Sequence, residues 1–163
     1  MASMTEKKID TTSDELLQLV SFTIGEEEFG VDILQVQEIN RMVTITSVPN
    51  APEFVDGVIN LRGKVIPIID LRTRFGMKRK EHDKNTRIIV VELRGNVVGF
   101  VVDAVREVLR IPRGVTEPPP SVVAGIHADY ITAVGKLEDR LLILLDLDKV
   151  FSFEEHDALK EVA

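Results

Sequence analysis

The sequence predicts a mainly β fold of two small barrels, because the chain carries an internal repeat and many short apolar runs separated by glycine-rich turns. Residues 58–75 match residues 134–151, a spacing of 76 positions (134 minus 58), with Val, Leu, Asp, Leu and Phe recurring in register. Upstream, the Val-x-Glu pattern of residues 36–38 recurs at residues 105–107, a spacing of 69. A repeat of this length indicates two copies of one supersecondary unit.

The composition excludes several classes of protein. A chain of 163 residues that is 44% hydrophobic can form an ordinary buried core, and no apolar run approaches the roughly 20 residues of a membrane-spanning helix. The lack of cysteine removes disulfides, thiolate nucleophiles and cysteine-ligated metals. The net charge of -7 opposes general binding to nucleic acid or to an anionic membrane. We therefore expect a soluble cytoplasmic protein that neither binds nucleic acid nor inserts into a membrane.

The first copy of the repeat begins after a polar segment. Residues 1–15 are predicted to be a disordered tail, and order is expected from residue 16 onward. Residues 17–24 and 28–31 indicate a hairpin around Gly25. Residues 32–39 fit a helical turn or a strand, and a short turn followed by a strand is the favoured interpretation.

The remaining elements follow from proline and glycine positions. Two prolines make residues 47–52 a loop. Residues 55–61 and 64–70 predict strands joined at Arg62-Gly63, and Pro67 indicates an edge position or a bulge. Residues 86–93 and 97–103 predict a further hairpin.

The second copy differs by an insertion. The change in spacing predicts seven extra residues (76 minus 69), and the loop-forming residues 111–121 are the expected place for them. Residues 152–163 are predicted to form a C-terminal helix or tail, because Ser152 and Glu155 have the spacing of a capping box.

Asp70 and Asp146, one in each copy, are the sharpest candidates for catalysis, since paired carboxylates in a duplicated β protein can share a proton. A catalytic carboxylate pair requires an exposed loop supported by glycine. Each of these aspartates instead ends a long apolar strand and is followed by a leucine. A helix N-cap is the preferred interpretation of both. We therefore give them structural roles and predict no catalytic residue.

The other motifs also give no catalytic, metal-binding or nucleic-acid-binding site. His82, His127 and His156 are scattered, so neither a metal site nor a cofactor is predicted. The basic residues 78–84 have acidic interruptions and no aromatic neighbours, which favours a solvated connection over a nucleic-acid patch. The proline run 118–120 is interpreted as a stiff loop and not as a polyproline ligand.

Features that suit protein binding remain. Arg62 lies at a predicted hairpin tip, near Gly57 and Gly63, which allow close backbone approach; an ordinary turn with a solvated arginine is the alternative. Five further positions are candidates for a surface between the two units, and barrel core is their alternative: Val36, Glu38, Val105, Glu107 and Val108.

The block from Asn60-Leu61-Arg62-Gly63 to Asp70-Leu71-Arg72, together with residues 29–39 and 48–57, resembles the CheW family of bacterial chemotaxis adaptors. The resemblance covers residues 16–155. It implies a single domain of two intertwined five-stranded SH3-like barrels, related by a pseudo-twofold axis, with short helices and neither enzymatic activity nor cofactor. It also implies two partners in membrane-anchored signalling arrays: the cytoplasmic tips of methyl-accepting chemoreceptors and the regulatory domain of the histidine kinase CheA.

The resemblance carries roles to individual positions. Five residues match positions of receptor binding in a groove between the barrels, namely Val36, Glu38, Gly57, Arg62 and Val108. Kinase contacts are implied at the outer ends of the barrels, without individual residues. Ala133 departs from the glycine usual in relatives, which makes the backbone there less permissive. A CheW-like adaptor for surface motility or second-messenger control stays as the alternative function, and a β-barrel enzyme is the competing class.

Overall fold

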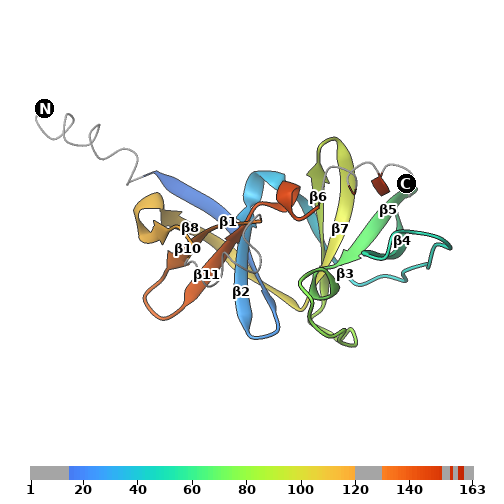
Figure 1. Cartoon of the computed structure of the whole chain (residues 1–163), viewed down its shortest axis with the longest axis horizontal. Helices are drawn as coiled ribbons and strands as arrows, with labels where there is room; N and C mark the ends of the chain where they lie inside the picture. The colour runs from blue at the N-terminus through green and yellow to red at the C-terminus, as the bar shows by residue number, and fades with distance from the viewer. Residues whose placement is uncertain (1–14, 120–129, 152–154, 156–157, 160–163) are drawn as a thin grey trace, which may run out of the picture.

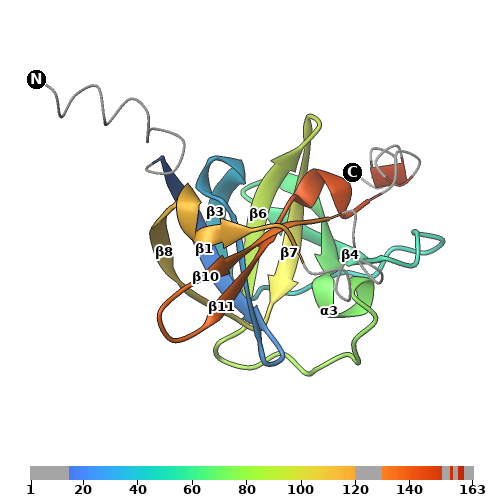
Figure 2. The same ribbon diagram turned by 60° about the vertical axis from the view of Figure 1, so that its left-hand side comes forward.

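Two β-barrels lie side by side in the computed structural model (Figure 1 and Figure 2). The structure describes residues 15–119, 130–151, 155, 158 and 159. Almost all of the predicted N-terminal tail, and most of the predicted C-terminal helix, therefore lie outside the described residues. Among the residues described, no helix is long and apolar enough to cross a membrane.

Barrel 1 is a six-stranded sheet, whose order is β8 (Ala104–Pro112), β1 (Leu16–Ile24), β2 (Glu27–Asp32), β11 (Leu141–Leu145), β10 (Ile131–Lys136) and β9 (Thr116–Glu117). Barrel 2 is a five-stranded sheet, whose order is β3 (Val36–Arg41), β6 (Arg87–Leu93), β7 (Asn96–Val102), β5 (Lys64–Asp70) and β4 (Val55–Leu61). The mainly β fold is thus confirmed. The two-residue β9 is the one addition to five strands per barrel.

Each barrel contains strands from both copies of the repeat. In barrel 1 the hairpin β1–β2 of the first copy joins β8, β10 and β11 of the second; in barrel 2 the hairpin β6–β7 of the second copy joins β3, β4 and β5 of the first. Figure 1 shows this exchange as blue strands beside orange ones in barrel 1, and green strands beside a yellow one in barrel 2. Neither copy therefore completes a barrel from its own strands.

The exchanged hairpins attach through parallel pairing. β2 pairs with β11 at Leu144↔Gly30, and β7 pairs with β5 at Ile68↔Gly99, while the other strand pairs are antiparallel. A glycine stands at each parallel joint because a side chain would meet the barrel interior. A Cβ on Gly99 would lie 2.6 Å from Ile68 Cδ1 and 2.8 Å from Ile88 Cγ2, whereas one on Gly30 would lie 3.3 Å from Leu142 and Leu144.

The apolar residues form three clusters. Small clusters fill the barrels, one around Leu19, Leu142 and Leu144 in barrel 1 and one around Ile66, Ile68 and Ile88 in barrel 2. The largest cluster takes residues from both sheets and includes a chain of aromatic contacts, Phe22–Phe29–Phe75–Tyr130. The valine- and isoleucine-rich strands therefore bury one face inside a barrel and the other between the barrels.

A partly buried ion pair fastens the two copies together at one end. Arg72 of α3 (Leu71–Arg74) donates from Nε and Nη2 to Asp103, at 3.0 and 2.7 Å, and the Gly25 amide of the β1–β2 turn donates to the same carboxylate at 2.7 Å. Burial acts to raise the pKa of Asp103, but the hydrogen bonds from Arg72 and Gly25 outweigh it, so this pKa lies below its ordinary value.

The described elements also correct two predictions. Residues 111–117 are not a loop: Ile111 and Pro112 end β8, residues 113–115 form the 3-10 helix η2 (Arg113–Val115), and β9 follows. Pro67 does not lie on an edge strand, since β5 pairs with both β4 and β7, but the alternative of a bulge agrees with the register shift between Val55 and Gly57 on the paired strand β4. Its missing amide is tolerated because the parallel pairing with β7 begins one residue later, at Ile68.

Gly99→Ala should destabilise the protein by about 1 to 3 kcal/mol, because the new methyl group overpacks the joint between β7 and β5. Gly30→Ala is the matched control, since its methyl group has more room at the equivalent joint. Urea unfolding of both variants measures the difference. Equal losses would contradict the account of the joints.

Asp103→Asn should lower the free energy of unfolding at neutral pH. A carboxylate whose folded pKa is depressed contributes stability above its unfolded pKa, about 3.9 for Asp, and loses it as the pH falls through the folded value. The gap between Asp103→Asn and wild type should therefore shrink on acidification. Urea titrations across that range test this, with Glu81→Gln in an exposed loop as the control; a gap independent of pH would refute it.

Candidate functional site

Arg62 is presented by a two-residue turn between β4 and β5. Arg62 and Gly63 both have positive φ, 52° and 85°, as a tight hairpin turn requires, and Asn60 Oδ1 accepts a hydrogen bond from the Gly63 amide at 2.9 Å. The β6–β7 hairpin has the same turn at Arg94-Gly95, with φ of 50° and 82°. The backbone geometry is therefore ordinary hairpin chemistry, and the distinctive feature is what the Arg62 side chain contacts.

Arg62 forms an ion pair with Glu38 of β3. Arg62 Nη2 lies 2.5 Å from Glu38 Oε1 and 2.7 Å from Oε2, and the arginine side chain is 71% exposed. The hydrogen bond from Arg62 lowers the pKa of Glu38, so the carboxylate stays charged. A hollow of about 210 Å³ lies beside the pair, lined in part by Leu61, Val90 and Val97.

The ion pair also has a place in the barrel. β3 and β4 are the two edges of the five-stranded sheet, so a contact between Glu38 on β3 and the turn after β4 joins these edges. Close to the same edge, Thr46 and Val58 exchange backbone hydrogen bonds of 2.8 and 2.9 Å. The Glu38–Arg62 pair therefore presents an exposed charge at the place where the two edge strands of barrel 2 meet.

The other predicted receptor-binding residues lie in different environments. Val36 is partly buried and packs against the largest apolar cluster. Gly57 is buried, and a Cβ there would lie 2.3 Å from the Thr46 carbonyl oxygen, so it has a packing role. Val108 is 55% exposed on β8 of barrel 1, while Glu38 and Arg62 belong to barrel 2. Val105, for which the sequence allowed either an exposed surface or the barrel core, packs against the largest cluster.

A second ion pair, missed by the sequence reasoning, stands in barrel 1. Arg140 Nη2 donates to Glu107 at 3.1 Å, and its Nε donates to the buried Glu28 at 2.6 Å. Glu107 matches Glu38 in the repeat, but the arginine stands two residues beyond the match of Arg62, which is Glu138. In the repeat, Glu138 and Asp139 stand where the first copy has Arg62 and Gly63. The sequence feature that could have revealed this pair is Arg140 itself, which directly follows Glu138 and Asp139 in the same turn.

Asp70 and Asp146 lie at equivalent helix starts. Asp70 Oδ1 accepts from the Arg72 amide at 2.9 Å, and Asp146 Oδ1 accepts from the Asp148 amide at 3.1 Å, at the start of η3 (Leu147–Lys149). Burial raises the pKa of Asp70, with a further contribution from Asp56, against the lowering effect of the Arg72 amide. Each aspartate supplies a first-turn hydrogen bond acceptor.

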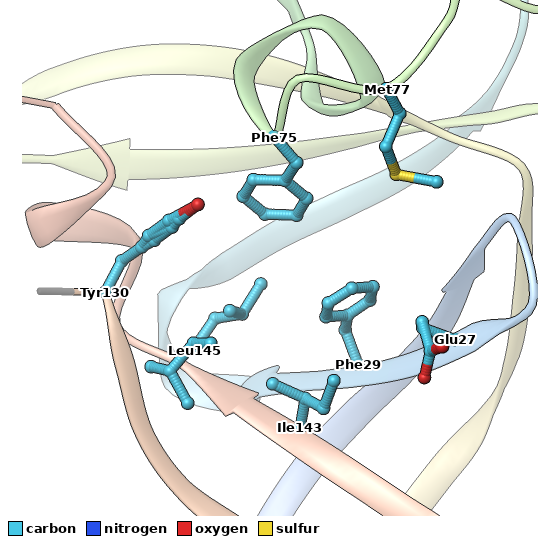
Figure 3. A pocket seen from close by; sticks show the side chains of 8 residues that line it. Glu27, Phe29, Phe75, Met77, Tyr130, Ile143 and Leu145 are labelled. Carbon is cyan, nitrogen blue, oxygen red and sulfur yellow. The ribbon is translucent and has the colours of Figure 1, made fainter. Parts of the chain in front are cut away.

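An apolar cavity lies between barrel 1 and the segment after α3. It has a volume of about 250 Å³, and in Figure 3 the rings of Phe29, Phe75 and Tyr130 and the Met77 side chain surround it. Glu27 is the one acidic residue among the described residues that line the cavity. The cavity contains no pattern of catalytic groups. Within the described part of the chain no cluster of three or more His, Cys, Asp or Glu could hold a metal ion.

The comparisons with known proteins decide the family. The model of the CheW-like domain matches residues 18–155. The chain belongs to the CheW family. It is 40% identical to the chemotaxis protein CheW of Klebsiella aerogenes, over all of this chain and 96% of that protein, and 39% identical to that of Rhizobium meliloti, over 86% of this chain and 91% of that protein.

A solved structure agrees with this assignment. The crystal structure of the scaffolding protein TtCheW from Thermoanaerobacter tengcongensis matches with a TM-score of 0.76 and 42% identity, over 83% of this chain and 92% of that one. The CheW relatives are named as chemotaxis and scaffolding proteins, not as enzymes. The chain is therefore a non-enzymatic adaptor of the chemotaxis family, as the sequence resemblance predicted.

Asp70→Ala should destabilise the CheW-like domain by about 0.5 to 2 kcal/mol through loss of the cap, whereas Asp70→Asn keeps an acceptor and should be at least as stable as wild type at neutral pH. Because the folded pKa of Asp70 is raised, wild type should gain stability relative to Asp70→Asn as the pH falls through that pKa. Urea unfolding at about pH 7 and about pH 4 measures both effects. A wild type that loses stability relative to Asp70→Asn on acidification would contradict this assignment.

Proposed function

We propose that this protein couples the cytoplasmic tips of chemoreceptors to the regulatory domain of the histidine kinase CheA, in the cytoplasm and at membrane-anchored arrays. The CheW-like domain supports the proposal, as do relatives that are named for chemotaxis; these names favour chemotaxis over the alternative chemosensory pathways. The proposal needs no reaction, only binding surfaces for two partners.

The observation that carries the proposal is the Glu38–Arg62 pair. Arg62 projects from a rigid hairpin tip and keeps most of its side chain exposed, while Glu38 fixes its direction. An arginine held in this way loses little conformational entropy when a partner binds, and its five N–H donors suit the carbonyl and carboxylate groups of a helix hairpin. Exposed pairs of this kind contribute little to folding. Binding therefore explains the arrangement better than stability does.

The receptor surface in this proposal consists of Val36, Glu38, Arg62 and Val108, with Gly57 acting through packing. Val108 supplies exposed apolar area, and Arg62 supplies the polar anchor. Gly57 keeps the strand close to the Thr46 carbonyl, so it positions the segment before β4. Val36 supports β3 from the apolar cluster. An apolar contact with one oriented charge is a common way to recognise a helical segment.

Signalling then follows from thermodynamic coupling. Receptor and kinase occupy separate surfaces of one adaptor, and if binding of one partner changes the affinity for the other by some factor, the reverse effect has the same factor. Weak individual contacts are sufficient when many adaptors act in one array.

Arg62→Ala should weaken binding of a purified receptor tip by about tenfold or more while leaving the thermal melt nearly unchanged, because exposed ion pairs add little to folding. Binding by calorimetry and a melt by circular dichroism measure the two effects. Lys84→Ala, an equal loss of charge at an exposed loop position, is the control and should bind normally. A collapsed fold in Arg62→Ala, or unchanged binding, would count against the proposed site.

A further inference from the structure

Two residues that face each other across barrel 2 carry charges of the same sign. Arg41, the last residue of β3, pairs in register with Arg87, the first residue of β6. Residues paired in this way lie on one face of the sheet with Cβ atoms about 4.5 to 5.5 Å apart, and like charges there are destabilising. In the registers of the described strands, this is the one pair in which both residues are charged. The fold therefore brings two guanidinium groups together at a cost.

The two arginines share a hollow with a third cation. The hollow has a volume of about 410 Å³, and six described residues line it: Arg41, Met42, Asp83, Lys84, Thr86 and Arg87. Three of them are cations and one is an anion, so the lining has a formal charge of +2 (three minus one). The whole chain carries a charge of -7. An anion that the protein as a whole repels is therefore attracted at this place.

The described part of the chain does not neutralise this charge. None of the three cations forms an ion pair with a described residue. Asp83, the one carboxylate in the lining, already has other partners. Its Oδ2 lies 3.3 Å from Lys80 Nζ, and its Oδ1 accepts a hydrogen bond from the Asn85 amide at 2.7 Å. The opposite charge has to come from a bound anion.

The turn before β6 holds the donors of Arg87 in place. The Thr86 amide donates to the Asp83 carbonyl at 3.2 Å, and the Asp83 amide donates to Thr86 Oγ1 at 2.8 Å. Arg87 Nη1 donates to the carbonyl oxygens of Lys84 and Thr86 at 2.8 and 2.9 Å. Its Nε and Nη2 make no hydrogen bond with a described residue. A guanidinium fixed in this way loses little conformational entropy when it binds a ligand.

The charge and the lining together indicate the class of the anion. Guanidinium groups bind phosphate oxygens through paired hydrogen bonds, and a lysine adds a point charge. A single carboxylate would leave a charge of +1 in the hollow, whereas a doubly charged phosphate group balances the +2 of the lining. The described lining contains no aromatic ring on which a nucleobase could stack. These features favour a small phosphate compound over a nucleotide or an acidic side chain.

We propose that the hollow lined by Arg41, Lys84 and Arg87, here called the barrel-2 anion site, binds a doubly charged phosphate group, either free phosphate or a small phosphate monoester. The inference goes beyond the proposed function, because the site uses none of the residues of the proposed receptor surface and requires neither partner. A bound phosphate group offsets the repulsion between the two arginines and so stabilises the folded chain.

The test is Arg41→Glu, with inorganic phosphate and glycerol phosphate as the probes in calorimetric titrations at constant ionic strength. Wild type should bind at one site, and the probe with the higher affinity identifies the source of the phosphate group. Arg41→Glu should bind about tenfold more weakly or less, because a charged hydrogen-bond donor is replaced by a like charge. Lys84→Gln, which leaves the strand pair intact, should also weaken binding.

Urea unfolding of Arg41→Glu gives a second readout. The new carboxylate lies opposite Arg87, so in chloride buffer the variant should unfold at a higher urea concentration than wild type. Added phosphate should raise the unfolding midpoint of wild type more than that of the variant. An Arg41→Glu variant that is less stable than wild type in chloride would contradict the repulsion on which the site is based.

Arg110→Glu is the matched control, since Arg110 is an exposed strand arginine without an ion pair to a described residue. It should bind both probes as wild type does, and a thermal melt checks that each variant is folded. Absence of binding to wild type, or equal weakening by Arg41→Glu and Arg110→Glu, overturns the inference. A tetraglutamate peptide that binds more tightly than both probes also overturns it, because the hollow would then belong to an acidic protein segment.

Discussion

Parallel pairing at two equivalent joints is the constraint on which the rest of the structure depends. β2 must reach β11 at Gly30, and β7 must reach β5 at Gly99, before either barrel is complete. Each joint combines a hairpin from one copy of the repeat with strands from the other, so the two barrels form together. The glycines permit this because no Cβ enters the barrel interior. The largest apolar cluster and the Arg72–Asp103 pair then hold the barrels in one arrangement.

This arrangement places one arginine–glutamate ion pair in each copy of the repeat. The edge strands β3 and β4 of barrel 2 correspond to β8 and β10 of barrel 1, where the short β9 is added beyond β10. An arginine and a glutamate meet across each of these closures. The two copies share this pairing, but the neighbouring charges differ, since Glu138 and Asp139 stand where the first copy has Arg62 and Gly63. Duplication followed by divergence of surface charge is a direct route to an adaptor with two different partners.

The repeat, the hairpins and the caps could be predicted from the sequence because they rest on local rules. The strands 55–61 and 64–70 have the predicted bounds, and the turn at Arg62-Gly63 has the backbone that its residues favour. The exchange of hairpins between copies was implied only by the family resemblance, since nothing local states which sheet a hairpin joins. Residues 111–117 were mistaken for a loop because β8 gains its pairing from β1, about 90 residues earlier in the chain. Arg140 was missed because the repeat was compared position by position. Arg140 lies two residues beyond the match of Arg62, yet its side chain reaches Glu107, the equivalent of Glu38.

The most direct test of the adaptor account is whether one chain holds both partners at once. Analytical ultracentrifugation of the protein with a saturating receptor tip and kinase regulatory domain measures this. Separate receptor and kinase surfaces on one adaptor predict a ternary complex whose mass equals the sum of the three components. Two binary complexes that exclude one another, with no ternary species at saturation, would contradict the claim that this fold links two partners through distinct sites.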